Sequence, residues 1–483
     1  MPLDDDAAYR VLKARDARFD GQLFVGVSST GIYCRPVCRV RTPKRENCRF
    51  FASRAQAEAA AFRPCLKCRP EIAPGLSLMD SSAALAASAA CSIEHAVHGG
   101  QTLRLPALAA RLGVTDRHLR RIFQTAHGVA PREFLATQRL LLAKQLLTDT
   151  AQPVTQVAWA SGFDSLRRFN AAFVQHYRMS PGALRRARGD DAGRTPTLLR
   201  LAWRPPFDLE ALLGHFARRE LPGIEQVDGL ALRRTLAWQH RGQRVQGWFN
   251  AQFVPERFEL HVGASDSLAP ALGGLLQRMR QAFDLDADPA QVDPVMTLLP
   301  LPLRPGLRLP GAFCGFEAAV RIVLGQQVTV PAARTLTQRL VNLLGEPMAT
   351  PFPALTRLFP TPQALAGASP DALGRLGIVR QRVRALQALA RAVDSGELQL
   401  RRGAPLQATL DSLRALPGIG EWTAQLVALR ALGWPDAWPA SDIGLMNALG
   451  TRDPRQVTAR AEAWRPWRAY ALMRLWHHLE TNP

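Results

Sequence analysis

Lysine is almost absent from this sequence of 483 residues and occurs only at positions 13, 44, 67 and 144. The sequence also lacks an apolar run long enough to cross a bilayer. Its acidic start, MPLDDD, lacks the apolar core of a signal peptide. We therefore expect a cytoplasmic, soluble protein without membrane contact, in a compartment that disfavours structural disulfides.

Negative charge is scarce as well, because 40 Asp and Glu stand against 61 Lys and Arg, for a formal net charge of +21. The isoelectric point is near 11.0. Such an excess indicates a polyanionic partner, most often nucleic acid. The alternative is a coding bias toward arginine, and the scarcity of lysine indicates that such a bias is present too.

Four of the seven cysteines form two closely spaced pairs: Cys34 and Cys38, then Cys65 and Cys68. This spacing is typical of a tetrahedral Zn²⁺ site with four thiolate ligands. The sequence therefore predicts one zinc ion and a small domain, residues 1–76, whose folding depends on it. Two unrelated buried pairs are the alternative, and Cys48 is expected to be a small buried apolar residue.

Basic residues surround the first pair: Arg35, Arg39, Arg41, Lys44 and Arg45. A zinc-bound thiolate stays deprotonated, and these cations would bring DNA phosphate close to it. Four thiolates on Zn²⁺ carry a net charge of about −2, which alkylation of one sulfur reduces to about −1. We therefore hypothesise that the site takes a methyl group and then binds DNA better, although this chemistry does not choose among the four sulfurs.

The runs GIYCRPVCRVRTPKRENCRFF and AFRPCLKC resemble the amino-terminal domain of the Ada family. In that family the domain takes a methyl group irreversibly from a methylphosphotriester in DNA onto its first cysteine. The resemblance implies that Cys34 is the catalytic methyl acceptor as well as a zinc ligand. We place Arg41 among the DNA contacts.

Residues 83–187 hold two helix-turn-helix patterns joined by an expected helix over 131–148. The first, LRLPALAARLGVTDRHLRRIFQTAHG, turns at Gly113, with Thr115 as the cap of the next helix. The second, PVTQVAWASGFDSLRRFNAAFVQHYRMSP, turns at Gly162. Two such units can enter successive major grooves about 34 Å apart. The pattern resembles the AraC-type DNA-binding domain, with a plain helical bundle as the alternative. The residues expected to contact DNA are Arg117, His118, Arg120, Arg121, Ser165, Arg167, Arg168 and Asn170.

Residues 186–197, RARGDDAGRTPT, are polar and are interpreted as an interdomain linker. After it, TLLRLAW, RVQGWFNAQFV and RFELHVG alternate like strands, with a helix over 208–219. We expect a small α+β domain, residues 197–300, that serves as a packing module. Residues 301–483 are mostly helical, so the fold class predicted for the chain is multidomain and mainly α, with α+β parts.

The run LPGIG, from Leu416 to Gly420, predicts a tight hairpin between two helices. Gly418 and Gly420 permit positive φ, and free N–H groups there can bind DNA phosphate. Asp442 follows in a loop that begins another helix. This pairing resembles the helix-hairpin-helix DNA glycosylase superfamily, specifically the AlkA-type 3-methyladenine DNA glycosylase. The match spans 198–478 and includes GFEAAVRIVLGQQV and WRPWRAYALMRLW.

The resemblance implies that Asp442 is the catalytic carboxylate. A purine alkylated at N3 or N7 is already cationic, so a carboxylate that stabilises the sugar cation is enough for the base to leave. The base must first be flipped out of the duplex. The rival carboxylates, Asp436 and Glu421, are expected at the surface. The alternative role for Asp442 is an ordinary helix cap.

Trp422 and Trp476 match family positions in the base pocket, where indole faces attract a cationic ring; ordinary core positions are the alternative. Gln327 matches the residue that wedges into the duplex, and we place it among the DNA contacts. Leu426 and Ile443 stand where a member of the family has two tyrosines, so the range of excised bases is left open.

Trp422 also stands where some members of the superfamily carry the lysine that forms an imine, and no lysine follows Lys144. We therefore expect a monofunctional glycosylase that leaves the strand intact. Cys314 is the only cysteine after Cys91, which argues against the four-cysteine iron–sulfur cluster of some relatives. Its setting, AFCGF, differs from the Pro-Cys-His-Arg of the O6-methylguanine transferase that ends typical Ada regulators, so the glycosylase is inferred to replace that module.

These patterns together predict a monomer that senses and repairs alkylated DNA. Its expected activities are methyl transfer to Cys34, transcriptional regulation, and hydrolytic excision of bases of the 3-methyladenine and 7-methylguanine class. The expected partners are double-stranded DNA and RNA polymerase. One alternative is a transcription activator whose glycosylase half only binds DNA. Another is a repair enzyme whose helix-turn-helix units only add affinity.

Overall fold

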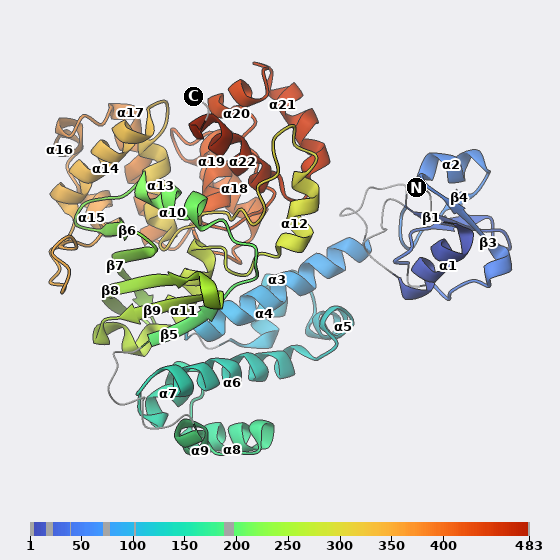
Figure 1. Cartoon of the computed structure of the whole chain (residues 1–483), viewed down its shortest axis with the longest axis horizontal. Helices are drawn as coiled ribbons and strands as arrows, with labels where there is room; N and C mark the ends of the chain where they lie inside the picture. Colours follow the sequence, from blue (N-terminus) through green and yellow to red (C-terminus); the bar gives the residue numbers. More distant parts are fainter. Residues whose placement is uncertain are drawn as a thin grey trace. The chain divides into compact units, whose positions relative to one another are not determined.

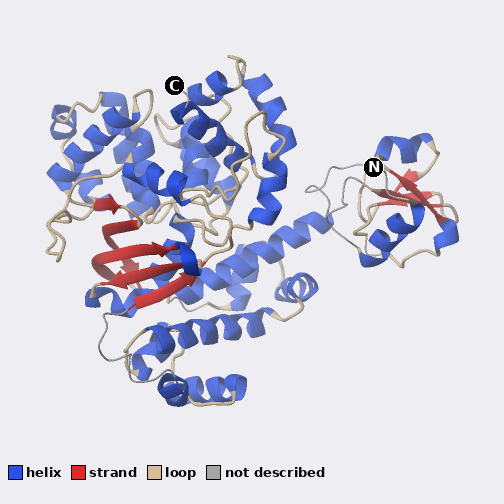
Figure 2. Cartoon of the chain, viewed as in Figure 1, coloured by secondary structure: helices blue, strands red, loops and turns tan. Residues whose placement is uncertain are grey.

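The computed structural model describes residues 4–15, 23–38, 40–70, 78–100, 103–187 and 198–481. The chain divides into two compact units: residues 1–92 with 104–134, and residues 93–103 with 135–483. The strands form two sheets, and helices make up most of the other regular structure of the described chain (Figure 2). No helix in these described ranges is long and apolar enough to span a membrane. A multidomain, mainly α fold with α+β parts is thus confirmed.

The amino-terminal lobe is built on a small four-stranded sheet. Its elements are α1 (Asp5–Ala14), β1 (Phe24–Val27), β2 (Ile32–Cys34), β3 (Cys48–Phe51), α2 (Arg54–Ala59) and β4 (Arg63–Pro64). The strand order is β3-β1-β2-β4, in which β2 and β4 run parallel and the other pairs antiparallel. The parallel pairing sets Tyr33 opposite Pro64. Cys34 and Cys65 therefore leave the two strands at neighbouring positions.

Helices α3 to α9 follow (Figure 1): α3 (Leu78–His98), α4 (Leu105–Arg111), α5 (Asp116–His127), α6 (Pro131–Asp149), α7 (Val154–Ala160), α8 (Leu166–Tyr177) and α9 (Pro181–Ala187). Both helix-turn-helix pairs are present as expected, and α6 is the expected connecting helix. Gly113 and Gly162 adopt left-handed φ values of 68° and 83° at the two turns. The Thr115 hydroxyl caps α5 by accepting a hydrogen bond from His118 N at 3.2 Å. Residues 188–197 of the expected linker lie outside the described residues.

The second sheet has five antiparallel strands in the order β5-β9-β8-β7-β6. They are β5 (Leu198–Ala202), β6 (Glu225–Asp228), β7 (Ala231–His240), β8 (Gln243–Val254) and β9 (Glu259–Ala264). Strands β5, β8 and β9 and helix α10 (Leu209–Ala217) were expected from the sequence. Strand β7 was not, because successive residues along it are buried, so it lacks the alternation of a half-exposed strand.

The remaining chain is helical and surrounds one large apolar core. Its helices are α11 (Leu272–Ala282), α12 (Pro289–Met296), α13 (Gly315–Leu324), α14 (Val330–Leu344), α15 (Pro362–Gly367), α16 (Pro370–Arg375), α17 (Arg380–Asp394), α18 (Leu406–Ala415), α19 (Glu421–Arg430), α20 (Ile443–Ala448), α21 (Pro454–Ala461) and α22 (Arg468–Thr481). The predicted hairpin joins α18 to α19. Asp442 is the N-cap of α20, Trp422 lies in the first turn of α19, and Trp476 lies within α22. Gln327 lies between α13 and α14.

Candidate active site and metal centre

The four paired cysteines converge in the amino-terminal lobe. Their sulfur atoms all lie within 4.8 Å of one another, and all four side chains are buried. Zn–S bonds of about 2.3 Å in a tetrahedron place the sulfurs a little under 4 Å apart, so this donor set fits Zn²⁺. The cluster forms because the parallel pairing of β2 with β4 brings one cysteine of each pair together.

Backbone amides distinguish the four sulfurs. Arg35 N donates to Cys68 Sγ at 3.4 Å, and the amide of Val40 donates to Cys38. Within the described residues no backbone amide donates to Cys34 or Cys65. A sulfur that accepts a hydrogen bond is a weaker nucleophile, so Cys34 and Cys65 carry the two sulfurs whose nucleophilicity no backbone amide of the described residues reduces.

The basic residues near the first cysteine pair differ in exposure. Arg41 and Lys44 are exposed, whereas Arg35 is buried. Arg45 is partly covered and pairs with Asp5 and Asp6 of α1, at 3.4 and 3.0 Å. Arg39 lies outside the described residues. Arg41 and Lys44 are therefore open to solvent, and Lys44 Nζ lies 3.7 Å from Glu46 Oε1.

The two expected recognition helices, α5 and α8, present several of the predicted contact residues to solvent. Arg117, Arg120, Arg121, Arg167, Arg168 and Asn170 are exposed. His118 is half-buried and lies 3.2 Å from an Arg121 guanidinium nitrogen. The Ser165 hydroxyl caps α8 by accepting from Arg168 N at 3.4 Å. Their contacts with DNA stay predictions.

The two glycines of the hairpin at 416–420 differ in conformation. Gly418 uses the freedom of glycine, with a φ of 76°, whereas Gly420 is extended, with φ −94° and ψ −176°. Gly420 is the N-cap of α19 and offers no side chain to the first amides of that helix. Both glycines are exposed, so the N-terminus of α19 is open to an anion.

Asp442 is both a helix cap and a pocket residue. One carboxylate oxygen, Oδ1, accepts from Leu445 N and from Trp476 Nε1, each at 2.9 Å. The other, Oδ2, accepts from Trp422 Nε1 at 2.9 Å. The side chain is only 9% exposed. Three donors on three different elements hold this carboxylate in one orientation.

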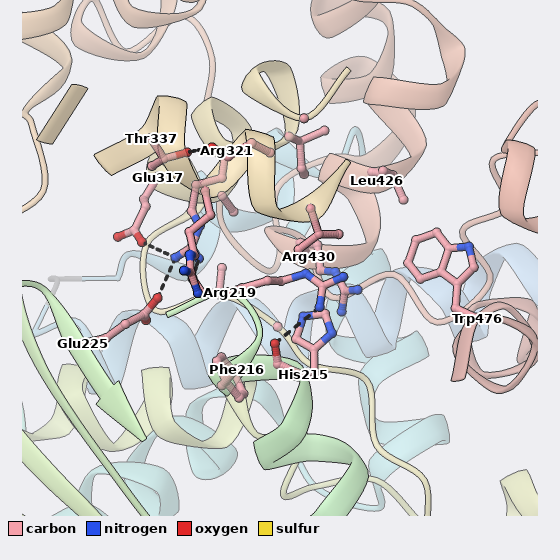
Figure 3. Close-up of a pocket in the computed structure, with 18 of the residues that line it drawn as sticks. His215, Phe216, Arg219, Glu225, Glu317, Arg321, Thr337, Leu426, Arg430 and Trp476 are labelled. Carbon is pink, nitrogen blue, oxygen red and sulfur yellow. Dashed lines mark hydrogen bonds and ion pairs between the residues drawn. The ribbon is translucent and has the colours of Figure 1, made fainter. Parts of the chain in front are cut away.

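A cavity of about 450 Å³ opens beside this carboxylate. Asp442, Trp422, Leu426 and Trp476 line one part of it. Sequence reasoning missed the residues that line the other part of the cavity (Figure 3). They are His215 and Phe216 on α10, Arg219 just after α10, and Arg430 on α19. Only the abundance of arginine hinted at such residues.

A buried ion network forms another wall of the cavity. Arg234 on β7 pairs with Glu225 on β6 and with Glu317 on α13. Arg321 pairs with the same two carboxylates, at 2.9 and 3.1 Å. Burial lowers the pKa of Arg234, but Glu317 and Glu225 outweigh it and raise that pKa above its ordinary value. The network ties the sheet to α13.

The rival carboxylates have structural partners. Glu421 is exposed and pairs with Arg414 at 2.6 Å, as the surface expectation required. Asp436 is only 5% exposed and pairs with Arg465 and Arg468, each at 2.7 Å. The expectation of a surface role for Asp436 was therefore wrong, because these two arginines enclose it. Neither carboxylate lines the cavity.

Gln327 is exposed and has a left-handed φ of 53°, a conformation that non-glycine residues rarely adopt. The preceding residue, Gln326, donates to Gly418 O and to Thr423 Oγ1, each at 2.9 Å. The Gln327 loop is thus tied to the hairpin. Near the carboxylate, Leu426 is buried whereas Ile443 is 63% exposed.

Four family models match the chain: the metal binding domain of Ada over 7–71, a helix-turn-helix domain over 108–187, the AlkA N-terminal domain over 198–314, and the HhH-GPD superfamily of base excision DNA repair proteins over 320–466. A relative from Mycobacterium tuberculosis, described as a probable bifunctional transcriptional activator/DNA repair enzyme AlkA, is 37% identical over 99% of this chain and 97% of its own length.

Two further relatives match the carboxy-terminal part. DNA-3-methyladenine glycosylase 2 of Escherichia coli is 37% identical over 57% of this chain and 96% of its own. The solved structure of a 3-methyladenine DNA-glycosylase from Archaeoglobus fulgidus shares the fold, with a TM-score of 0.50 and 20% identity over 58% of this chain and 97% of that one.

Proposed function

The chain belongs to the family of AlkA-type bifunctional transcriptional activators and DNA repair enzymes, and on that premise we propose that it regulates transcription and excises alkylated bases from DNA. The observation that carries the repair activity is the Asp442 carboxylate, held by two indole N–H groups at the edge of a cavity. A carboxylate kept only as a cap would not need tryptophan donors beside an open pocket.

The excision step follows from the position of this carboxylate. A flipped base enters the cavity, and the C1′–N bond of its nucleotide breaks with the electron pair leaving on the base. The Asp442 carboxylate stabilises the resulting sugar cation. Water then adds to C1′ and loses a proton, which leaves an abasic site. A base that is already cationic, such as 3-methyladenine or 7-methylguanine, departs as a neutral molecule.

The strand is proposed to stay intact. Strand cleavage by an imine mechanism needs a neutral amine, and the sequence from position 145 onward contains no lysine. Arginine cannot substitute, because its guanidinium stays protonated. The hairpin and the α19 N-terminus would hold the DNA backbone, and exposed Gln327 would fill the space that the flipped base leaves.

Base release from methylated DNA tests this proposal. Wild type should release free methylpurines, strand breaks should form only after added alkali, and borohydride should trap no adduct. Asp442→Asn should slow release by orders of magnitude while binding to an abasic duplex persists. Release by Asp442→Asn as fast as by wild type, or a trapped covalent complex, would refute the mechanism. A wild type that binds DNA but releases no base would favour the alternative, an activator with a catalytically weak glycosylase part.

The amino-terminal lobe is proposed to act as a suicidal methyl acceptor. Bound zinc would keep the four sulfurs as thiolates. Cys34 Sγ would attack the methyl carbon of a methylphosphotriester, so that an S–C bond forms, the C–O bond breaks, and the phosphate leaves as a diester anion. Support comes from the family resemblance and from the absence of a backbone amide donor to Cys34 among the described residues. Exposed Arg41 and Lys44 would hold the phosphate.

Mass spectrometry distinguishes the sulfurs. After exposure to DNA carrying methylphosphotriesters, about 14 Da should be added at Cys34, the mass of a methyl group replacing a proton. Modification of Cys65, the other sulfur without a backbone donor, would reassign the acceptor.

After methylation, the helix-turn-helix pairs would bind promoter DNA and bring the protein to RNA polymerase. Loss of specific promoter binding only in the methylated protein would contradict this order of events.

A further inference from the structure

The cavity beside Asp442 continues beyond the space between Trp422 and Leu426. Figure 3 shows the guanidinium groups of Arg219 and Arg430 close to the ring of His215. In this view the two glutamates, Glu225 and Glu317, lie on one side of them and Trp476 lies on the other. The Arg430 guanidinium carbon lies 6.0 Å from the centroid of the Trp476 ring. The indole N–H of Trp476 in turn reaches Asp442 at 2.9 Å. Trp476 is therefore close to the Arg430 guanidinium through its ring and bonded to Asp442 through its indole N–H.

These two guanidinium groups have only neutral partners. Arg219 donates to His215 O at 3.3 Å, and Arg430 donates to Pro310 O and, at 3.4 Å, to Met473 Sδ. Neither lies within ion-pair distance of a carboxylate of the described chain. The nearby Glu480 pairs instead with Arg218, at 2.5 Å.

Two other arginines of the cavity differ from Arg219 and Arg430 because they have carboxylate partners. Arg234 and Arg321 lie in the same cavity, and each pairs with both Glu225 and Glu317. For the unpaired arginines, burial lowers the pKa of Arg430 to about 9 and that of Arg219 to about 10. Both side chains are half-buried, and a lowered pKa is the direction expected when such a charge lacks an anionic partner.

Burial also lowers the pKa of His215, so its ring adds no full charge and can donate or accept one hydrogen bond. Glu480, which also lines the cavity, is the acidic group that raises the pKa of both arginines. Its ion pair with Arg218 leaves their charge incompletely matched. An anion that entered between Arg219 and Arg430 would therefore meet uncompensated positive charge.

We propose that Arg219 and Arg430 form a carboxylate subsite of the base pocket, which makes the enzyme select purines alkylated on a ring nitrogen by a group that ends in a carboxylate, such as carboxymethyl. This inference rests on the proposed glycosylase function. Planar guanidinium groups match a carboxylate in two-point hydrogen bonding.

The lesion and the cavity are complementary in charge at both ends. The alkylated ring is cationic and lies beside the Asp442 carboxylate, while the acid group of its substituent reaches the two guanidinium groups beyond Trp476. The cavity volume of about 450 Å³ lies in the range of pockets that hold ligands well above the size of one methylated purine. A backbone phosphate is a poorer occupant, because the chain on both sides of it would have to enter the cavity as well.

The test compares three duplexes that differ only in the group on N7 of one guanine: methyl, carboxymethyl, and the neutral isostere carbamoylmethyl. Single-turnover release by wild type should be about 10- to 100-fold faster for carboxymethyl than for carbamoylmethyl, the range expected for hydrogen bonds to a charged group. Arg430→Gln and Arg219→Gln should bring this ratio close to one, and Arg430→Lys should retain part of it. Arg334→Gln is the matched control, because Arg334 lines the same cavity but is exposed.

Release of 7-methylguanine separates the two possible failures. If wild type releases 7-methylguanine but treats the two larger groups alike, the subsite is refuted and the glycosylase function stands. If wild type releases no base, binding decides: free N7-carboxymethylguanine should quench tryptophan fluorescence at concentrations about 10-fold or more below the carbamoyl base. Equal quenching by the two free bases would refute the subsite, and so would an unchanged release ratio in folded Arg430→Gln and Arg219→Gln.

Discussion

Replacing Asp442 by asparagine should remove more than a charge. Oδ1 accepts two hydrogen bonds, from Leu445 N and Trp476 Nε1, whereas Oδ2 accepts one, from Trp422 Nε1. An asparagine has a single acceptor oxygen, which satisfies the larger number of donors when it takes the Oδ1 position. Its NH₂ group then faces the Trp422 N–H, so two donors meet at 2.9 Å.

The cost can be worked from these contacts. One hydrogen bond to a charged group is lost, for about 1.5–3 kcal/mol. For a unit as large as residues 93–103 with 135–483, each kcal/mol lowers the melting temperature by about 1–2 °C, so Asp442→Asn should melt roughly 2–6 °C below wild type. Trp422→Phe removes the opposing N–H, so in the asparagine background it should cost much less stability than it does in wild type.

The measurement is a double-mutant cycle on Asp442→Asn and Trp422→Phe, with denaturation followed by circular dichroism. The coupling free energy should be about 1.5–3 kcal/mol, while base release stays lost in both asparagine variants. Trp438 provides the matched control, because its buried Nε1 has no hydrogen-bond partner in the described part of the chain, so Trp438→Phe should show no coupling with Asp442→Asn. A coupling within about 0.5 kcal/mol of zero for the Trp422 pair would show that its indole N–H does not hold the carboxylate.

Three other variants test separate parts of the chain. Metal analysis should find one zinc ion in wild type and none in the double variant Cys65→Ala/Cys68→Ala; full retention of zinc by the variant would contradict the four-sulfur site. Burial raises the pKa of Glu317, but Arg234 and Arg321 outweigh it and hold that pKa below its usual value. The stabilisation from ionised Glu317 is thus complete above the pKa of an unfolded glutamate and is lost as pH falls through the pKa of Glu317 in the folded protein. Glu317→Gln should therefore be destabilised near neutral pH by about 3 kcal/mol. In urea denaturation its free energy of unfolding should fall less on acidification than that of wild type. Arg168→Ala should weaken promoter binding by about 1–3 kcal/mol if it contacts a base; unchanged affinity in gel-shift titration would remove it from the interface.

Features encoded locally were predictable from the sequence. The cysteine spacing carries the zinc site, because ligands that share one ion must come in close pairs. Thr115 was expected as a cap because the side chain and the amide it bonds are three residues apart. Gly113 and Gly162 marked the two turns for the same reason, since only their own backbone conformation is involved.

Features that depend on distant segments were not predictable. Asp436 looked like a surface carboxylate until Arg465 and Arg468, about thirty positions later, were found around it. Arg219 reaches the cavity from the segment just after α10 and Arg430 reaches it from α19, and no local pattern connects these two segments. The role of Trp476 as a donor to Asp442 likewise required the fold, because the tryptophan faces alone suggested stacking on a base.

The buried ion network makes the sheet and the helical part depend on each other, because each part supplies charges that the other neutralises. A gene fusion that joins a regulator to a glycosylase upstream of Leu198 leaves the network complete. A junction near residue 300 would separate Arg234 and Glu225 from Glu317 and Arg321, so each fragment would carry buried charges without their partners. A junction that precedes the sheet therefore keeps the four charged partners together, whereas a junction between the sheet and α13 separates them.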